Sequence, residues 1–187
     1  MEGKIVYFEK PGVDNTEEVF RIAKSRAKEL GIDKIVVSST RGDTAVHAVE
    51  FFKGMKVLVV SYVAGMKERD IQPFTEENRR KVESGGAVIV TAAHAFAGVS
   101  RAIRQKFDTI TIVEIIAQTL RNFGQGMKVV CEISLMAADA GQVRTDEEII
   151  VLGGTGRGVD TAVVLQPVDS QRFFDLRIKE ILCKPRL

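Results

Sequence analysis

The sequence has little cysteine and no apolar run long enough to cross a bilayer. Its two cysteines, Cys131 and Cys183, match neither a metal-ligand nor a redox spacing in a chain of 187 residues. We therefore expect two reduced thiols, no metal site and a cytoplasmic location. The short apolar runs argue against membrane insertion, and residues 1–4 show no start of a secretory signal.

The sequence also lacks an excess of either charge. Its 27 Lys and Arg residues against 25 Asp and Glu residues give a net charge of +2. A protein that binds nucleic acid over much of its surface has a clear basic excess, so we expect no nucleic-acid partner. An anion that binds this chain is expected to bind at one local site.

Strand and helix patterns alternate over the first two thirds of the sequence. Helical patterns at 16–30, 43–53 and 75–83 connect strand patterns, and strands joined by helices favour a parallel sheet with helices on both faces. The last third contains three strand patterns without a helix between them, which predicts antiparallel neighbours. The predicted strands are 4–8, 34–37, 56–62, 87–91, 148–152, 159–166 and 174–182.

We therefore expect one α/β domain over residues 1–187. The expected fold is a three-layer α/β/α arrangement around a mixed, mostly parallel sheet with antiparallel C-terminal strands. A chain of this length buries a sufficient core without disulfides or metals. No repeat or linker indicates a second domain.

Three further helices are predicted between the fourth and fifth strands. A helix after residue 98 is expected to turn Val99, Ala102, Ile103 and Phe107 inward. A helix that starts with a capping box at Thr111 is expected to do the same with Ile112, Ile115, Ile116, Leu120 and Phe123. The third, at 127–140, is apolar on most sides, and Glu132 and Asp139 are expected to form its one solvated stripe.

The turn after the second long strand, residues 38–44, is the first candidate binding site. A strand that runs into a helix amino end presents free backbone N–H groups and the positive end of a dipole, which attract phosphate. Hydroxyl groups and an arginine add donors, although an ordinary capped turn has the same composition. The candidate phosphate-binding residues are Ser38, Ser39, Thr40, Arg41, Gly42 and Thr44.

The glycine-rich loop between the fifth and sixth strands is the second candidate. Its glycines let the backbone approach a ligand and turn N–H groups inward as an anion nest, while a flexible hairpin loop explains them equally well. Two loops of this kind could clamp the two ends of one anionic ligand. The candidate residues are Gly154, Thr155, Gly156, Arg157 and Gly158.

No catalytic motif is visible, but His94 and Asp139 are candidates for acid–base chemistry. His94 follows the fourth strand and is expected to face the same crevice as Thr40, although a packed histidine is the simpler interpretation. For Asp139, a solvated helix position is simpler. His47 is expected to be solvated.

Residues 35–45 resemble the strand, turn and helix of the C-terminal domain of pyruvate kinases. One residue is inserted, and arginine and glycine exchange order, so side-chain roles do not carry over one for one. Over nearly the whole chain the sequence is similar to archaeal and bacterial proteins called pyruvate kinase α/β domain-like. The residues that carry this resemblance are 16–18, 36–44, 93–95, 121–126, 136–141 and 153–158.

The resemblance implies the three-layer fold, standing alone without the kinase barrel. It also implies flavin mononucleotide (FMN) as a ligand, because members of the family are associated with that flavin. It implies no reaction, and nothing in the sequence resembles the catalytic apparatus of the kinase. In pyruvate kinases the corresponding turn accepts a phosphate of a sugar bisphosphate effector.

The leading hypothesis is a protein that binds a phosphorylated small molecule, FMN first. The alternatives are an enzyme, either a flavin-dependent oxidoreductase or a cofactor-free enzyme that acts on a phosphorylated metabolite, and a regulatory module that senses sugar phosphates. A regulatory module would act through a partner or through a homo-oligomer.

Overall fold

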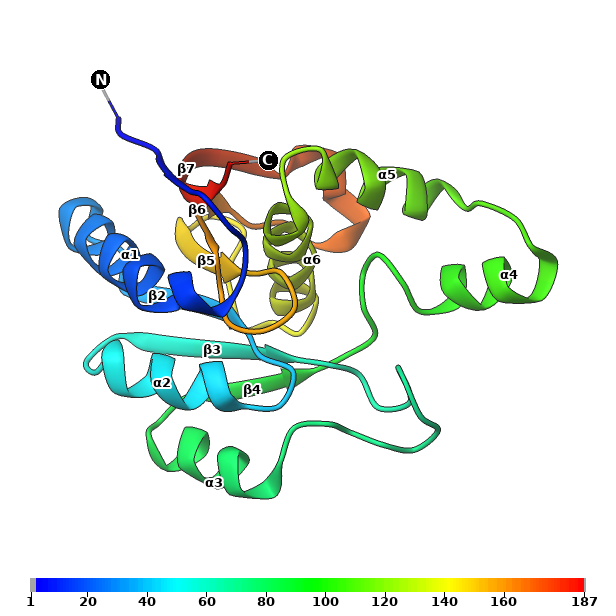
Figure 1. Cartoon of the computed structure of the whole chain (residues 1–187), viewed down its shortest axis with the longest axis horizontal. Helices are drawn as coiled ribbons and strands as arrows, with labels where there is room; N and C mark the ends of the chain where they lie inside the picture. The colour runs from blue at the N-terminus through cyan, green and yellow to red at the C-terminus, as the bar shows by residue number, and fades with distance from the viewer. Residues whose placement is uncertain (1–2, 187) are drawn as a thin grey trace.

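A computed structural model describes residues 3–186, which contain a seven-stranded mixed sheet (Figure 1). The strand order is β1-β7-β6-β5-β2-β3-β4. The β5–β6 and β6–β7 pairs are antiparallel, and the other neighbouring pairs are parallel, which confirms the predicted sheet. The strands are β1 (Val6–Phe8), β2 (Lys34–Ser38), β3 (Lys56–Ser61), β4 (Val88–Thr91), β5 (Ile149–Gly153), β6 (Thr161–Gln166) and β7 (Arg177–Pro185).

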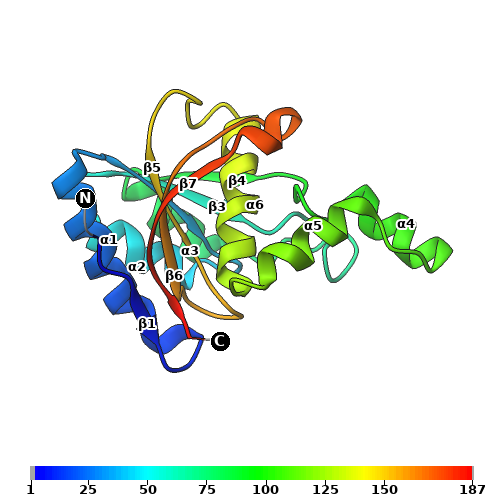
Figure 2. The same ribbon diagram turned by 90° about the horizontal axis from the view of Figure 1, so that it is seen from above.

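Helices cover both faces of this sheet, as Figure 2 shows from above. The first face packs against α1 (Thr16–Leu30), α2 (Asp43–Phe51) and α3 (Glu76–Ser84). The other packs mainly against α6 (Gln125–Asp139), which follows α4 (Val99–Phe107) and α5 (Ile112–Arg121). Side chains alternate along a strand, so Ile35 and Val37 of β2 join the first core and Val36 joins the second. The predicted three-layer arrangement is confirmed.

The start of α6 packs unusually close to the sheet. A Cβ atom at Gly126 would lie 2.1 Å from Thr161 Oγ1 and 2.7 Å from Asp160 Oδ1, so only glycine fits there. This approach places the first turns of α6 beside the ends of β2 and β5. Polar side chains in those turns therefore face the same edge of the sheet as the predicted loops.

The carboxyl ends of β2, β3, β4 and β5 lie at one edge because these strands are mutually parallel. The turn after β2, the segment after β4 and the glycine-rich loop after β5 all begin there. Hydroxyl groups replace apolar side chains at this edge, and Ser61 Oγ lies 2.7 Å from Thr91 Oγ1. Ligands of open parallel sheets bind at such an edge.

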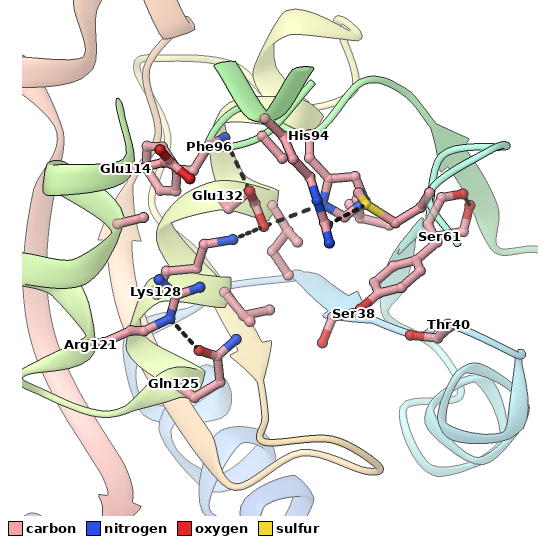
Figure 3. Close-up of a pocket in the computed structure, with 18 of the residues that line it drawn as sticks. Ser38, Thr40, Ser61, His94, Phe96, Glu114, Arg121, Gln125, Lys128 and Glu132 are labelled. Atoms are coloured by element: carbon pink, nitrogen blue, oxygen red, sulfur yellow. Dashed lines mark hydrogen bonds and ion pairs between the residues drawn. The ribbon is translucent and has the colours of Figure 1, made fainter. Parts of the chain in front are cut away.

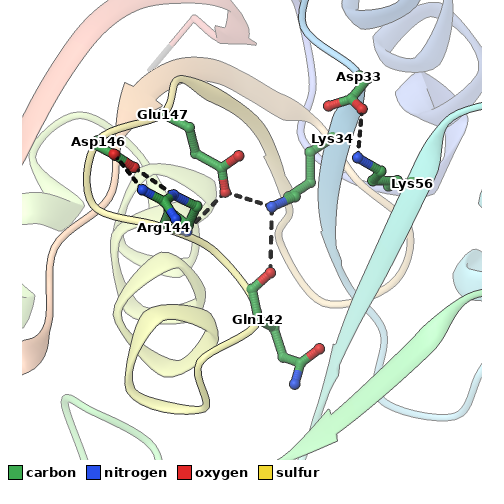
Figure 4. Close-up of polar contacts among 7 residues, drawn as sticks. All are labelled: Asp33, Lys34, Lys56, Gln142, Arg144, Asp146 and Glu147. Atoms are coloured by element: carbon green, nitrogen blue, oxygen red, sulfur yellow. Dashed lines mark hydrogen bonds and ion pairs between the residues drawn. The ribbon is translucent and has the colours of Figure 1, made fainter.

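The opposite edge carries ion pairs that join neighbouring segments (Figure 4). Lys56 Nζ lies 2.8 Å from Asp33 Oδ2, and Lys34 pairs with Glu147. The hydrogen bond from Lys56 lowers the pKa of Asp33 below its ordinary value. The Lys56–Asp33 pair is exposed, so solvent screens it and it contributes little to the stability of the fold.

The predicted inward faces of α4 and α5 are largely wrong. No residue of α4 is buried, and Val99 and Phe107 are 77% and 68% exposed. In α5, Ile116 and Leu120 contact the core, whereas Ile112 and Ile115 are exposed, as is Phe123 just beyond the helix. Figures 1 and 2 show why: α4 projects away from the sheet, so its apolar residues do not reach the core.

Two local predictions also differ. The last strand begins at Arg177 rather than at residue 174, because a 3-10 turn, η2 (Ser170–Asp175), precedes it. His47 is only partly solvated, because its ring packs 5.0 Å from that of Phe20.

No helix within residues 3–186 is both long enough and apolar enough to span a bilayer.

Candidate functional site

Two adjoining pockets lie at the carboxyl edge of the parallel strands. The outer pocket, of about 680 Å³, lies between the turn after β2 and the glycine-rich loop. The inner pocket, of about 340 Å³, lies between the ends of β2 and β3 and the helices α4, α5 and α6. They form one crevice because they share the lining residues Ser38, Ser39, Thr40, Tyr62, Gln125 and Val129.

Two of the predicted hydroxyl donors have internal partners. Ser39 is 6% exposed, and its Oγ accepts a hydrogen bond from the N–H of Ala45, in the first turn of α2, at 3.3 Å. Ser38 Oγ lies 3.5 Å from the carbonyl oxygen of Leu152 on β5. Both serines thus connect the turn to its own scaffold.

Gly42 serves the geometry of the turn and lines neither pocket. Its φ of 100° is in the left-handed region, which favours glycine. A Cβ atom there would lie 2.4 Å from Asn78 Cβ and 2.7 Å from the ring of Phe74. Glycine therefore allows the turn to pack against the segment that leads into α3.

The remaining predicted residues of this turn face the crevice. Thr40 lines both pockets, and Arg41 and Thr44 line the outer pocket. Among residues 3–186, the backbone N–H groups of Thr40, Arg41 and Gly42 have no hydrogen-bond acceptor. They precede the positive end of α2, so this turn has free donors at the rim of the outer pocket.

A carboxylate of the chain itself occupies part of the glycine-rich loop. The Oδ2 atom of the buried Asp160 accepts hydrogen bonds from the N–H groups of Thr155 and Gly12, both at 3.0 Å. Thr155 lines neither pocket. The other four predicted residues of the loop line the outer pocket: Gly154, Gly156, Arg157 and Gly158.

The outer pocket has no net charge from its Lys, Arg, Asp and Glu side chains. Arg157 bridges the two loops, with Nη2 3.7 Å from Asp43 Oδ2, and Asp43 Oδ1 also accepts a hydrogen bond from Asn78. Three basic side chains line the pocket beside three acidic ones: Arg41, Lys67 and Arg157, and Asp14, Glu17 and Asp43.

The inner pocket contains a buried chain of ionisable side chains (Figure 3). Figure 3 shows the Glu132 carboxylate between Lys128 and His94. Glu132 Oε2 lies 2.5 Å from Lys128 Nζ and 3.4 Å from His94 Nδ1, and Oε1 accepts the N–H of Phe96 at 3.0 Å. The side chains of Glu132, Lys128 and His94 are 4%, 9% and 10% exposed.

The contacts within this group of side chains determine the charges of Glu132 and Lys128. Burial alone would raise the pKa of Glu132, but the hydrogen bond from His94 and the Lys128 ammonium hold it below its ordinary value. Burial lowers the pKa of Lys128, and the ion pair with Glu132 only partly offsets this. The pair therefore consists of a carboxylate and an ammonium, and each of them depends on the other to stay charged.

The inner pocket has an excess of positive charge. Glu114 and Glu132 are its acidic residues, and Arg101, Arg104, Arg121 and Lys128 are its basic ones. Arg104 Nη1 lies 3.3 Å from Glu114 Oε1, and Arg121 Nε donates to Gln125 Oε1 at 2.7 Å. The pocket thus has two more basic side chains than carboxylates, without counting His94.

The structure separates the two candidates for acid–base chemistry. His94 lines the inner pocket together with Thr40, whereas Asp139 lines neither pocket and its Oδ1 accepts the N–H of Ser170 at 2.9 Å. The prediction of a solvated stripe is wrong for Glu132, which is 3% exposed.

Sequence reasoning missed Lys128, Glu132, Arg121 and Tyr62 as lining residues. The first two carry a usable signal, because opposite charges four residues apart in an otherwise apolar helix indicate a buried pair.

The titratable groups outside this cluster concern possible metal binding and thiol chemistry. Within residues 3–186, no three His, Cys, Asp or Glu side chains meet in a way that would hold a metal ion. Cys131 and Cys183 are unpaired and buried, and burial raises the pKa of each thiol to about 12. Both are therefore thiols at neutral pH.

The fold and the crevice define an α/β domain with a polar crevice at the carboxyl ends of its parallel strands. Residues 17–165 match the model of the family described as pyruvate kinase, alpha/beta domain. The chain belongs to this family, as the resemblance of residues 35–45 implied.

Proposed function

We propose that the chain binds a phosphorylated small molecule in the crevice and that FMN is this molecule. The phosphate lies on the turn after β2, with Thr40, Arg41 and Thr44 as its contacts, and Arg157 closes the outer pocket from the other side. The observation that carries the proposal is the free backbone N–H groups of Thr40, Arg41 and Gly42 beside the start of α2. Free backbone donors on three consecutive residues of a turn suit the oxygens of a phosphate.

The size and lining of the outer pocket support FMN as the ligand. Its volume of about 680 Å³ is in the range of pockets that hold cofactor-sized molecules. Tyr62 lines both pockets and offers an aromatic ring to a planar ligand. A bound flavin would supply redox chemistry, while the chain would supply the binding and orientation.

The first experiment compares Arg41→Ala with Arg80→Ala. Arg80 is an exposed arginine of the neighbouring helix α3 and lines neither pocket, so it is a matched control for the loss of one surface charge. A charge-assisted hydrogen bond contributes about 1.5–3 kcal/mol. Arg41→Ala should therefore weaken FMN binding about 10-fold or more, and Arg80→Ala should leave it unchanged.

Thermal unfolding with and without added FMN measures both variants, and mass spectrometry identifies any molecule that co-purifies. Equal FMN binding by the parent and Arg41→Ala would remove the phosphate role of Arg41. A protein that purifies colourless and shows no thermal shift with FMN would remove the flavin.

We also propose that copies of this chain pair through α4. Its exposed apolar residues include Val99 and Phe107, on a helix that projects from the body of the molecule (Figure 1). In a twofold dimer, the same exposed apolar residues of α4 are buried in both copies. Light scattering after gel filtration should give twice the monomer mass for the parent and for Lys106→Ser, and the monomer mass for Phe107→Ser. A monomeric parent would refute the pairing.

A further inference from the structure

One nitrogen of His94 is buried in the inner pocket without a partner. Its Nε2 atom is inaccessible to solvent and has no hydrogen-bond partner among residues 3–186. An unsatisfied buried polar atom is destabilising, so such an atom in a native structure requires an explanation. A bound ligand atom is one such explanation, because His94 lines a pocket.

Glu132 determines which nitrogen faces the ligand. The carboxylate lies 3.4 Å from Nδ1 of His94, so Nδ1 carries the hydrogen and donates to it. In the neutral imidazole, Nε2 then has a free lone pair, and on protonation it becomes a donor. Glu132 is held by Lys128 and by the N–H of Phe96, so it stabilises the imidazolium without moving.

The basic side chains that line the inner pocket select the charge of the ligand. Lys128 has one bond to Glu132, which leaves two ammonium hydrogens for a ligand. Arg121 uses Nε for Gln125 and presents the other end of its guanidinium to the same pocket. A cation or a neutral amine would meet repulsion here, whereas an oxyanion would meet charge-assisted donors.

We propose that the inner pocket is a proton-coupled oxyanion site in which a carboxylate or phosphate group binds to His94 Nε2 and Lys128 Nζ. As the group binds, the imidazole takes up one proton from solvent at Nε2, and the imidazolium then donates to the bound oxygen. Because Nε2 is inaccessible to solvent, side chains of the pocket must move for the group to reach it. Tyr62 and Met66 line the pocket from the segment after β3. The other charged groups that face this pocket are Arg101 and Arg104 from α4, and Glu114 and Arg121 from α5.

This site is separate from the turn after β2, which is proposed to bind a phosphate in the outer pocket. The two pockets meet at Thr40, so together they accept either a ligand with two anionic groups or two anionic ligands side by side. His94 touches the second group and is in position to exchange a proton with it.

The test is nitrogen NMR of the imidazole groups during titration with sulfate, and separately with acetate, at constant pH near 7. The chain has two histidines, and His47 lines the outer pocket, so its signal is separate from that of His94 in the inner pocket. Without a probe, His94 should show a hydrogen on Nδ1 and a lone pair on Nε2. Sulfate or acetate should move the Nε2 signal of His94 to the protonated position.

The two probes separate the two kinds of group. A response to sulfate alone indicates a phosphate-like group, and a response to acetate alone indicates a carboxylate. If neither probe changes the His94 signal, the inference is wrong. Because the parent protein is measured, this result does not depend on whether a variant folds.

Calorimetry of two variants adds a quantitative readout. His94→Asn should weaken binding of the responding probe about 10-fold or more and abolish the rise in its affinity from pH 8 to pH 6. Arg80→Ala, at an exposed position that lines neither pocket, should keep both. Arg41→Ala should leave the His94 response intact. The experiments can therefore refute the proposal for the inner pocket and the proposal for the outer pocket separately.

Discussion

Replacement of Glu132 by glutamine tests the buried ion pair of α6. The glutamine has nearly the same shape and keeps an oxygen for the N–H of Phe96, so the change removes mainly the charge next to Lys128. The two side chains are 4% and 9% exposed, which leaves little solvent to replace the lost partner. Removing one partner of such a pair costs about 3–5 kcal/mol.

The lower end of this range applies here. Burial already lowers the pKa of Lys128, so the lysine can release its proton when Glu132 is gone, which limits the cost. We expect Glu132→Gln to lose about 3 kcal/mol of unfolding free energy, or roughly 6–12 °C in Tm for a domain of this size. The double variant Glu132→Gln/Lys128→Met removes both charges and should recover most of this loss.

Urea unfolding followed by circular dichroism measures these values, since the chain has no tryptophan. Glu132 has a lowered pKa in the folded state, so its charge stabilises the fold above the ordinary value of 4.5 and stops doing so as pH falls through the lower folded value. The difference between parent and variant should be full at pH 6 and shrink below about pH 4.5. A loss under about 1 kcal/mol at pH 6 would refute the reasoning.

Two further predictions concern the scaffold of the crevice. Ser39→Ala should cost about 1 kcal/mol in urea unfolding, because the N–H of Ala45 loses its cap, while an unchanged midpoint would mean that Ser39 Oγ does not cap α2. Cys131 and Cys183 should react with a thiol reagent at pH 8 only in denaturant, because burial raises the pKa of each to about 12. Rapid reaction of the native protein would contradict the burial of these thiols.

Local patterns predicted the scaffold of the fold because they act over a few residues. Continuous apolar runs identify β2, β3 and β5, and the short connections between β5, β6 and β7 require antiparallel pairs. The fate of the apolar face of α4 was not predictable in this way. An amphipathic pattern shows that a helix has an apolar side, but whether the sheet is within reach depends on the path of the whole segment.

The site was predicted at the level of its loops and not of its contacts. The parallel β2 and β5 bring residues 38–44 and 153–158 to one edge, as their position after strands indicates. The pairing of His94 with Glu132 spans 38 positions and depends on how α6 packs. Ser39 and Gly42 look like ligand contacts in sequence, but the structure uses one as a cap and the other for close packing.

The most direct test of the proposed function is to titrate the protein with FMN and, in parallel, with riboflavin, following flavin fluorescence. The two ligands differ by the phosphate alone, so the comparison isolates the contact assigned to Thr40, Arg41 and Thr44. We expect saturable binding of FMN and binding of riboflavin at least about 10-fold weaker. No saturable change with FMN, or equal affinity for riboflavin, would contradict the proposal that this turn holds a phosphate.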